Sequence, residues 1–189
     1  KSNVRLASAR AGNVIGGGDW ALDRIVPDSM RAWASNQKVE IRCPEATRPW
    51  QHVLEPISGY LNLAYKLEEN INLNGESFNF GPNAEYNHNV KELLEDLTET
   101  WNFDNVSDAY ELTGNIKFHE AGLLKLNCDK ALFYLKWVAT LDYKKLLSFT
   151  GEWYYNYYMN NEIDMFKYTI NQINEYEQIA NKKNIKWSK

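Results

Sequence analysis

Hydrophobic positions along the chain occur in two kinds of run. Short runs in which apolar and polar residues alternate predict β-strands, and they lie at residues 4–11, 39–42, 77–80 and 117–119. Longer runs with apolar residues every three or four positions predict helices, at residues 23–36, 55–67, 90–101, 129–136, 142–157 and 162–182. Residues 12–20 and 43–49 are expected to be loops. Short strands that alternate with helices predict an α/β architecture.

The helix expected at residues 55–67 has the clearest apolar side. Glu55 and Pro56 begin it, and proline is favoured in a first helical turn because the N–H it lacks would be unpaired there. The residues predicted to face the core are Ile57, Tyr60, Leu61, Ala64 and Leu67.

The strand expected at residues 4–11 has no earlier strand to pair with. The chain starts at Lys1 rather than at a methionine. An unpaired strand exposes a row of N–H and C=O groups, which folded proteins usually cover. We therefore expect that a neighbouring strand is missing and that the chain is part of a larger fold.

Composition narrows the class of protein. The 189 residues suit one domain, or one domain and part of another. A net charge of −4 argues against binding nucleic acid through phosphate neutralisation. No run approaches the roughly 18 apolar residues of a membrane span, and no export signal is visible, so we expect a cytoplasmic protein with no membrane partner. Cys43 and Cys128 are too few for a disulfide framework or a zinc site, and we expect reduced thiols and no metal.

A glycine-rich loop is the first candidate for ligand binding. Gly16, Gly17 and Gly18 allow the backbone to bend and to approach a ligand closely. Asn13 and Arg24 flank them and could donate hydrogen bonds to a phosphate. The loop matches neither a GxGxxG fingerprint nor a P-loop, so a plain strand-to-helix connection explains it equally well.

A second candidate lies around Arg48. The planar guanidinium of arginine suits phosphate oxygens, and Pro49 would stiffen the backbone after it. A surface ion pair is the alternative for Arg48. His52 follows, and a structural, hydrogen-bonded histidine is favoured there over a general base.

A third candidate is weaker, and several catalytic motifs are missing. Glu120 beside His119 could hold a hydroxyl or amino group of a ligand. The three histidines have no metal-ligand spacing. The sequence contains no G-x-S-x-G elbow, no Tyr-x-x-x-Lys pair and no dinucleotide-binding glycine turn.

Several segments resemble the CDP-glucose 4,6-dehydratase family of the extended short-chain dehydrogenase/reductase (SDR) superfamily. The most specific are ARAGNVIGGGDW at residues 9–20, DRIVPD at 23–28 and RPWQHVLEP at 48–56. Weaker matches continue in order at residues 78–82, 119–121, 124–126, 153–154 and 172–176. The resemblance covers nearly the whole chain and corresponds to the C-terminal half of the family's chain. After Leu135 the family pattern has Gly-Trp, whereas Lys136 precedes Trp137 here.

The resemblance implies a fold and a reaction. Residues 1–12 would end a Rossmann sheet, residues 13–189 would form the nucleotide-sugar-binding lobe, and residues 53–82 would return toward the Rossmann side. The NAD-binding N-terminal half would be absent, and with it the catalytic Tyr and Lys. The family converts CDP-glucose to CDP-4-keto-6-deoxyglucose and water through NAD. The chain's partners would be CDP-glucose, its own N-terminal Rossmann half and a second copy in a homodimer.

The resemblance also implies roles for individual residues. None is catalytic, and the chain alone is expected to be inactive. Arg10 and Ala11 would lie beside the nicotinamide. The substrate-binding residues would be Asn13, Arg24, Ile25, Val39, Ile41, Arg48, Asn79 and Glu120.

Other functions share much of this pattern. A nucleotide-sugar 4-epimerase and a dTDP-glucose-type 4,6-dehydratase would have a similar lobe. An acidic pair beside the catalytic tyrosine, upstream of this chain, separates a dehydratase from an epimerase. A stand-alone nucleotide-sugar-binding module is the alternative from a different class, and it would need residues 4–11 to be paired within the chain.

Overall fold

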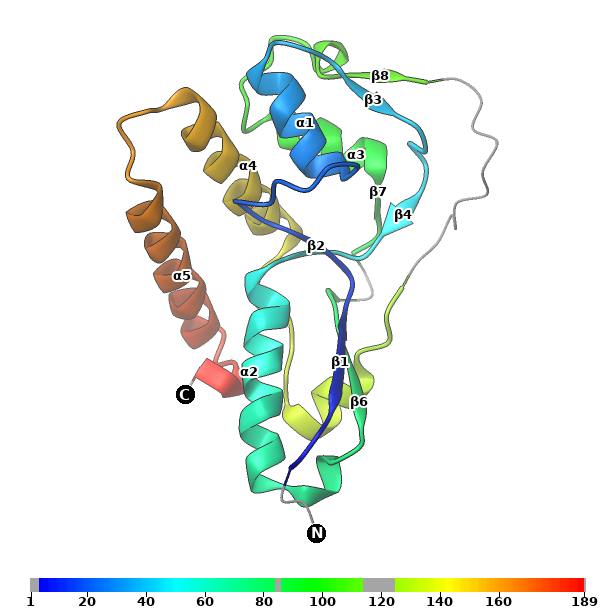
Figure 1. Ribbon diagram of the computed structural model, residues 1–189, viewed down its shortest axis with the longest axis vertical. Helices are drawn as coiled ribbons and strands as arrows, with labels where there is room; N and C mark the ends of the chain where they lie inside the picture. The colour runs from blue at the N-terminus through cyan, green and yellow to red at the C-terminus, as the bar shows by residue number, and fades with distance from the viewer. Residues whose placement is uncertain (1–3, 84–85, 114–124, 189) are drawn as a thin grey trace.

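A computed structural model describes residues 4–83, 86–113 and 125–188 of the chain (Figure 1). The strand expected at residues 117–119 and Glu120 lie outside these residues. The helices are α1 (Ile25–Ala34), α2 (Leu54–Glu69), α3 (Val90–Thr98), α4 (Tyr143–Met159) and α5 (Met165–Lys182). The strands are β1 (Ser8–Ala11), β2 (Asn13–Ile15), β3 (Val39–Ile41), β4 (Thr47–Arg48), β5 (Trp50–His52), β6 (Ser77–Phe80), β7 (His88–Asn89) and β8 (Tyr110–Leu112). The predicted mixed α/β class is confirmed.

Short helical turns complete the described elements. They are η1 (Ile71–Leu73), η2 (Val106–Asp108), η3 (Ala131–Leu135) and η4 (Lys186–Ser188). The helix expected at residues 129–136 is confirmed: residues 129–130 are α-helical, and η3, a π-helical turn, continues them to Leu135. It ends at Lys136, whose φ of 53° is left-handed, the conformation that the family's glycine would adopt more easily.

The strands pair two by two rather than in one wide sheet. β1 pairs with β6, β2 with β5 and β3 with β8, all in parallel, and β4 pairs with β7 in the antiparallel sense. The loops expected at residues 12–20 and 43–49 are each wrong in part, because residues 13–15 form β2 and residues 47–48 form β4. A two-residue strand is too short to produce an alternation that a sequence can reveal.

The described residues form two packed regions (Figure 1). In the upper region α1, α3 and α4 bury a core around Trp33, Leu94 and Leu146. In the lower region β1 and β6 lie beside α2, and Phe78 and Phe80 of β6 pack with Trp137. Residues 53–82 thus end beside β1 through the β1–β6 pair. The predicted domain boundary at residue 12 stays a prediction.

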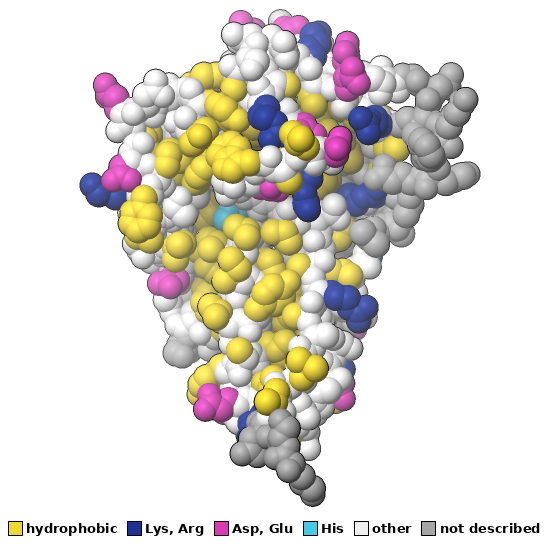
Figure 2. All heavy atoms as spheres, viewed as in Figure 1, with side chains coloured by type: hydrophobic (Ala, Val, Ile, Leu, Met, Phe, Trp, Pro, Cys, Tyr) yellow, Lys and Arg dark blue, Asp and Glu magenta, His cyan; other side chains and the backbone are white. Residues whose placement is uncertain are grey.

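The expected core face of α2 is wrong except for Leu67, which is partly buried against the lower core. Ile57, Tyr60 and Leu61 are 43%, 39% and 67% exposed, and Ala64 is exposed as well. The buried residues of this helix are Glu55, Pro56, Ser58, Gly59, Asn62 and Leu63. Gly59 explains the choice of side, since a Cβ there would overlap the Phe80 ring. Apolar side chains consequently cover much of the surface over α2 (Figure 2).

No helix within the described residues is both long and apolar enough to span a membrane.

Candidate functional site

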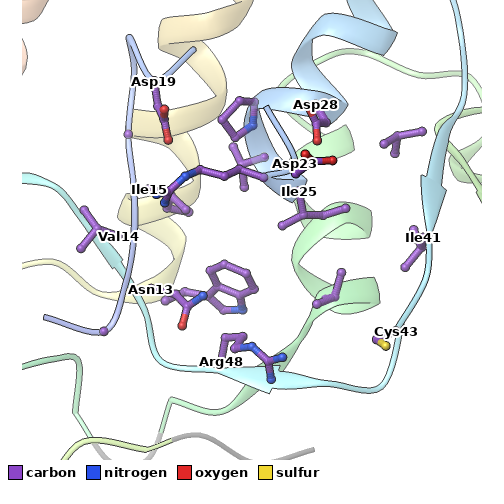
Figure 3. A pocket seen from close by; sticks show the side chains of 18 of the residues that line it. Asn13, Val14, Ile15, Asp19, Asp23, Ile25, Asp28, Ile41, Cys43 and Arg48 are labelled. Carbon is purple, nitrogen blue, oxygen red and sulfur yellow. The ribbon is translucent and has the colours of Figure 1, made fainter. Parts of the chain in front are cut away.

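A cavity of about 800 Å³ opens in the upper region (Figure 3). Its walls come from four parts of the chain: β2 with the glycine loop that follows it, the start of α1, the strand β3, and the segment that carries Arg48 and Trp50. The β2–β5 pair holds two of these walls together, because Asn13 lies opposite Trp50 in the register. The cavity therefore depends on segments that are distant in the sequence.

The structure brings most of the predicted binding residues to this cavity. Those that line it are Ala11, Asn13, Arg24, Ile25, Val39, Ile41 and Arg48. Two others lie away from it. Asn79 is on β6 and donates a hydrogen bond from Nδ2 to the carbonyl of Asn127 at 3.0 Å, and Arg10 is its exposed neighbour on β1. The binding roles themselves stay predictions.

Arg48 provides a buried positive charge at one end of the cavity. Its side chain lies near Asn13 (Figure 3), and the residue is only 8% exposed. Its Nη1 donates to the carbonyl of Thr47 at 2.8 Å. The Trp50 indole donates to the carbonyl of His88 at 3.1 Å, which holds this segment against β7. A guanidinium that is largely removed from water, with an amide beside it, suits an anionic group of a ligand.

The other end of the cavity is acidic. Asp19, Asp23 and Asp28 lie there (Figure 3). Asp28 forms an ion pair with Arg31, and Asp19 Oδ1 accepts from the backbone N–H of Ala21 at 3.0 Å. Sequence reasoning missed these carboxylates, and among the other lining residues that it missed are the ionisable side chains of Glu40, Arg42 and Cys43. The sequence did offer a signal for some of them, because Asp23 precedes the predicted site residue Arg24 and Glu40 lies between the predicted site residues Val39 and Ile41.

The glycine loop is closely packed. A Cβ on Gly17 would overlap the Trp153 ring, and one on Gly16 would lie 2.9 Å from Val53. The glycines are therefore required by protein neighbours on one side of the loop, while Gly16 and Asp19 line the cavity on the other. The packing on Trp153 and Val53 supports the structural explanation of the loop, and its role in ligand binding stays a prediction.

His52 has the structural role that was favoured for it. Its ring is buried against Phe149, and its Nδ1 accepts from the N–H of Leu54 at 3.4 Å. Burial lowers the pKa of His52 to about 4. The imidazole is therefore neutral at physiological pH, and it does not line the cavity described above.

We expect His52 to make stability depend on pH. Because its pKa falls from 6.5 to about 4 on folding, the unfolded chain binds the proton more tightly between these values. The stabilisation is complete above pH 6.5 and is lost progressively as the pH falls to 4. The shift corresponds to about 3 kcal/mol.

The measurement is the free energy of unfolding at pH 7.5 and 4.5, for the wild type and for His52→Asn. The Asn side chain keeps an acceptor for Leu54 but does not titrate. The pH-dependent loss should be smaller in the variant by about 3 kcal/mol. An equal loss in both proteins would show that His52 is not responsible.

The lining of the cavity is rich in polar and charged side chains. Its described lining contains arginine, asparagine and carboxylate side chains but no tyrosine, lysine, serine or histidine. This composition fits a ligand with a negatively charged group and several hydrogen-bonding groups.

The chain is similar to known proteins both in sequence and in fold. No family model matches the chain. Over 134 residues, 71% of its length, the chain is 47% identical to the CDP-glucose 4,6-dehydratase of Salmonella typhimurium. The chain is a relative of this dehydratase. It spans about a third of the dehydratase's length, 36%.

Solved structures show the same fold. The dTDP-glucose 4,6-dehydratase of Bacillus anthracis, in complex with NAD, superposes with a TM-score of 0.66 at 16% identity, over 80% of this chain and 44% of that one. The UDP-glucuronic acid 4-epimerase of Bacillus cereus, in complex with UDP-glucuronic acid and NAD, gives a TM-score of 0.65 at 15% identity, over 79% and 45%. The predicted extended SDR fold, in its C-terminal part, is confirmed. This relative of CDP-glucose 4,6-dehydratase thus has the lobe that both kinds of enzyme share.

Proposed function

We propose that the chain is the nucleotide-sugar-binding part of a CDP-glucose 4,6-dehydratase. The observation that carries the proposal is the placement of Arg48 and Asn13 together at one end of an 800 Å³ cavity. The 47% identity to a CDP-glucose 4,6-dehydratase supports the same substrate. The reaction would convert CDP-glucose to CDP-4-keto-6-deoxyglucose and water.

In this proposal Arg48 binds the diphosphate. A nucleotide sugar carries two adjacent negative charges, and a largely buried guanidinium can bind phosphate oxygens with two parallel hydrogen bonds. Asn13, at the start of β2, would donate from its amide to the same group. Val39 and Ile41 of β3 would flank the base with apolar side chains, and Arg24 and Ile25 would contribute at the start of α1.

NAD, when bound, would accept a hydride from the sugar and return it. The described residues contribute little to a dinucleotide site. Ala11 lines the cavity, but Arg10 does not, and the glycines after β2 pack on Trp153 and Val53 rather than forming an open turn. The dinucleotide would therefore be held by a Rossmann lobe outside this chain, with Ala11 at its edge. This chain's own residues would bind and orient the sugar nucleotide.

The lower region supports such a second lobe. β1 pairs only with β6 among the described residues, and three of its four residues are exposed. Parallel strands are normally covered on both faces and extended on both sides. The exposed apolar side of α2 lies beside this pair (Figure 2). We propose that a parallel sheet of the Rossmann lobe continues from β1 and that its packing covers α2. Homodimerisation and a cytoplasmic location stay predictions.

A charge on the exposed side of α2 should prevent this association. In Leu61→Asp, the carboxylate would have to be desolvated when the N-terminal half covers the helix. We expect at least a tenfold weaker association of the separately produced halves, measured by analytical ultracentrifugation. Phe166→Asp is the control, because Phe166 is 76% exposed in the first turn of α5 and is not part of α2. Equal association of both variants with the N-terminal half would argue against this docking face.

The function is tested with the full-length protein, CDP-glucose and NAD. A 4-keto product, seen by its absorbance in alkali, supports the proposal, and the isolated chain should show no turnover. Formation of CDP-galactose would identify a 4-epimerase instead, and a preference for dTDP-glucose would identify the other dehydratase. CDP affinity in the isolated chain, with no turnover by the full-length protein, would favour a stand-alone binding module.

A further inference from the structure

The glycine loop forms a wall of the cavity, yet its position is set by α4. Gly16 and Asp19 of the loop line the cavity. The loop itself has no regular secondary structure between β2 and α1. Whatever holds Asp19 in place therefore also sets the shape of the acidic end of the cavity.

The hydroxyl of Tyr154, on α4, forms hydrogen bonds with both backbone groups of Asp19, its N–H and its C=O. The Tyr154 hydroxyl accepts from the N–H of Asp19 at 3.1 Å and donates to the C=O of Asp19 at 2.8 Å. Tyr154 is fully buried, and burial raises the pKa of its hydroxyl. The hydroxyl therefore keeps the proton that it donates to Asp19 at all physiological pH values. The two residues are 135 positions apart in the sequence.

Trp153 supports the same loop one residue earlier in α4. Its ring occupies the space that a side chain at Gly17 would need. Its indole N–H donates to Thr169 Oγ1 of α5 at 2.9 Å, which fixes the ring plane. Trp20, at the end of the loop, packs edge-on against the Tyr154 ring at a centroid distance of 5.7 Å. The loop is thus held by hydrogen bonds, by ring packing and by a second helix behind the first.

We propose that Tyr154 is a positioning residue for the bound nucleotide sugar, acting through the backbone of Asp19. This inference rests on the proposed function for the identity of the ligand. It assigns to α4, which contributes no lining residue to the cavity, a part in binding. A wall that is already in its bound position avoids the entropy cost of ordering the loop when the ligand arrives.

The test compares Tyr154→Phe with Tyr155→Phe in the full-length protein. The first variant keeps the ring and removes only the two hydrogen bonds. Tyr155 is the matched control, since its ring packs on Trp101 rather than on Trp20. Two hydrogen bonds of ordinary strength predict about a tenfold increase in the KM for CDP-glucose in Tyr154→Phe, with kcat within about threefold of the wild type. Tyr155→Phe should leave both constants unchanged.

A second readout does not depend on the ligand. Amide hydrogen exchange in the segment around Asp19 should become faster in Tyr154→Phe and stay unchanged in Tyr155→Phe. An unchanged KM together with unchanged exchange would overturn the inference, and so would a fall in thermal stability with an unchanged KM. If the wild type neither binds nor converts CDP-glucose while exchange still responds to Tyr154→Phe, the proposed function fails, and with it the ligand-binding part of this inference, but the positioning of the loop stands.

Discussion

Arg48→Ala should weaken CDP-glucose binding by about 30- to 1,000-fold. Truncating one partner of a buried charge pair costs about 2–4 kcal/mol, which gives this range. The large value is expected because Arg48 is 8% exposed and lies at the end of the cavity opposite Asp19, Asp23 and Asp28. Water would compensate poorly for its loss in such a position. Isothermal titration of the full-length protein with CDP-glucose measures the effect.

Two further variants separate charge from geometry at this position. Arg48→Lys keeps a positive charge but loses the planar fork, so we expect an intermediate loss of about tenfold. Lys38→Ala removes an exposed cation whose Nζ donates to the carbonyl of Ser107, and it should leave binding unchanged. Equal affinities for the wild type and Arg48→Ala would remove Arg48 from the site and, with it, the central contact of the proposed function.

Glu55→Leu should destabilise the fold by about 3–5 kcal/mol. Glu55 is 2% exposed, and its carboxylate accepts hydrogen bonds from three donor groups. The backbone N–H groups of Thr140 and Leu141 donate to it at 2.9 and 2.6 Å, and the Tyr176 hydroxyl donates at 2.9 Å. A leucine of similar volume would leave these donors buried without a partner, and each unsatisfied group costs about 1–3 kcal/mol. Urea unfolding followed by tryptophan fluorescence measures the loss.

The same carboxylate allows a graded control. Burial raises the pKa of Glu55, against the opposing effect of the hydrogen bonds and of Lys183. Glu55→Gln retains one acceptor oxygen and should therefore cost less than Glu55→Leu, about 1–2 kcal/mol. Tyr176→Phe removes a single donor and should cost about 1 kcal/mol. Similar midpoints for Glu55→Leu and the wild type would mean that this buried network is not what joins α2 to the segment before α4.

The sequence was sufficient for the class of fold, and most of the binding residues that it predicted do line the cavity. Alternating runs located β3 and β6, and three- and four-residue spacing located the five helices. The family resemblance named Asn13 and Arg48, which the structure places together. These features depend on local spacing or on short motifs, which a single sequence displays directly.

Only the tertiary structure decided which side of α2 is covered. Apolar spacing predicted burial of Ile57, Tyr60 and Leu61, whereas the described residues bury Glu55 and Gly59 instead. Periodicity shows which residues share a face of a helix, but it does not show what packs against that face. Here Gly59 packs against Phe80, and Glu55 accepts from the backbone N–H groups of residues 140–141, so this side of α2 is buried. The apolar side stays exposed, and we propose that the Rossmann lobe covers it.

The same distinction applies to the cavity. The glycine loop was visible in the sequence, but Tyr154 and Trp153, which hold it, come from a helix that starts more than 120 residues later. The sequence by itself determined the helices, the strands β1, β3 and β6, and the side chains with anion-binding chemistry. The tertiary structure alone decided that Arg48 and Asp19 lie at opposite ends of one cavity, because contacts between distant segments depend on how whole elements pack and leave no periodic trace in the chain.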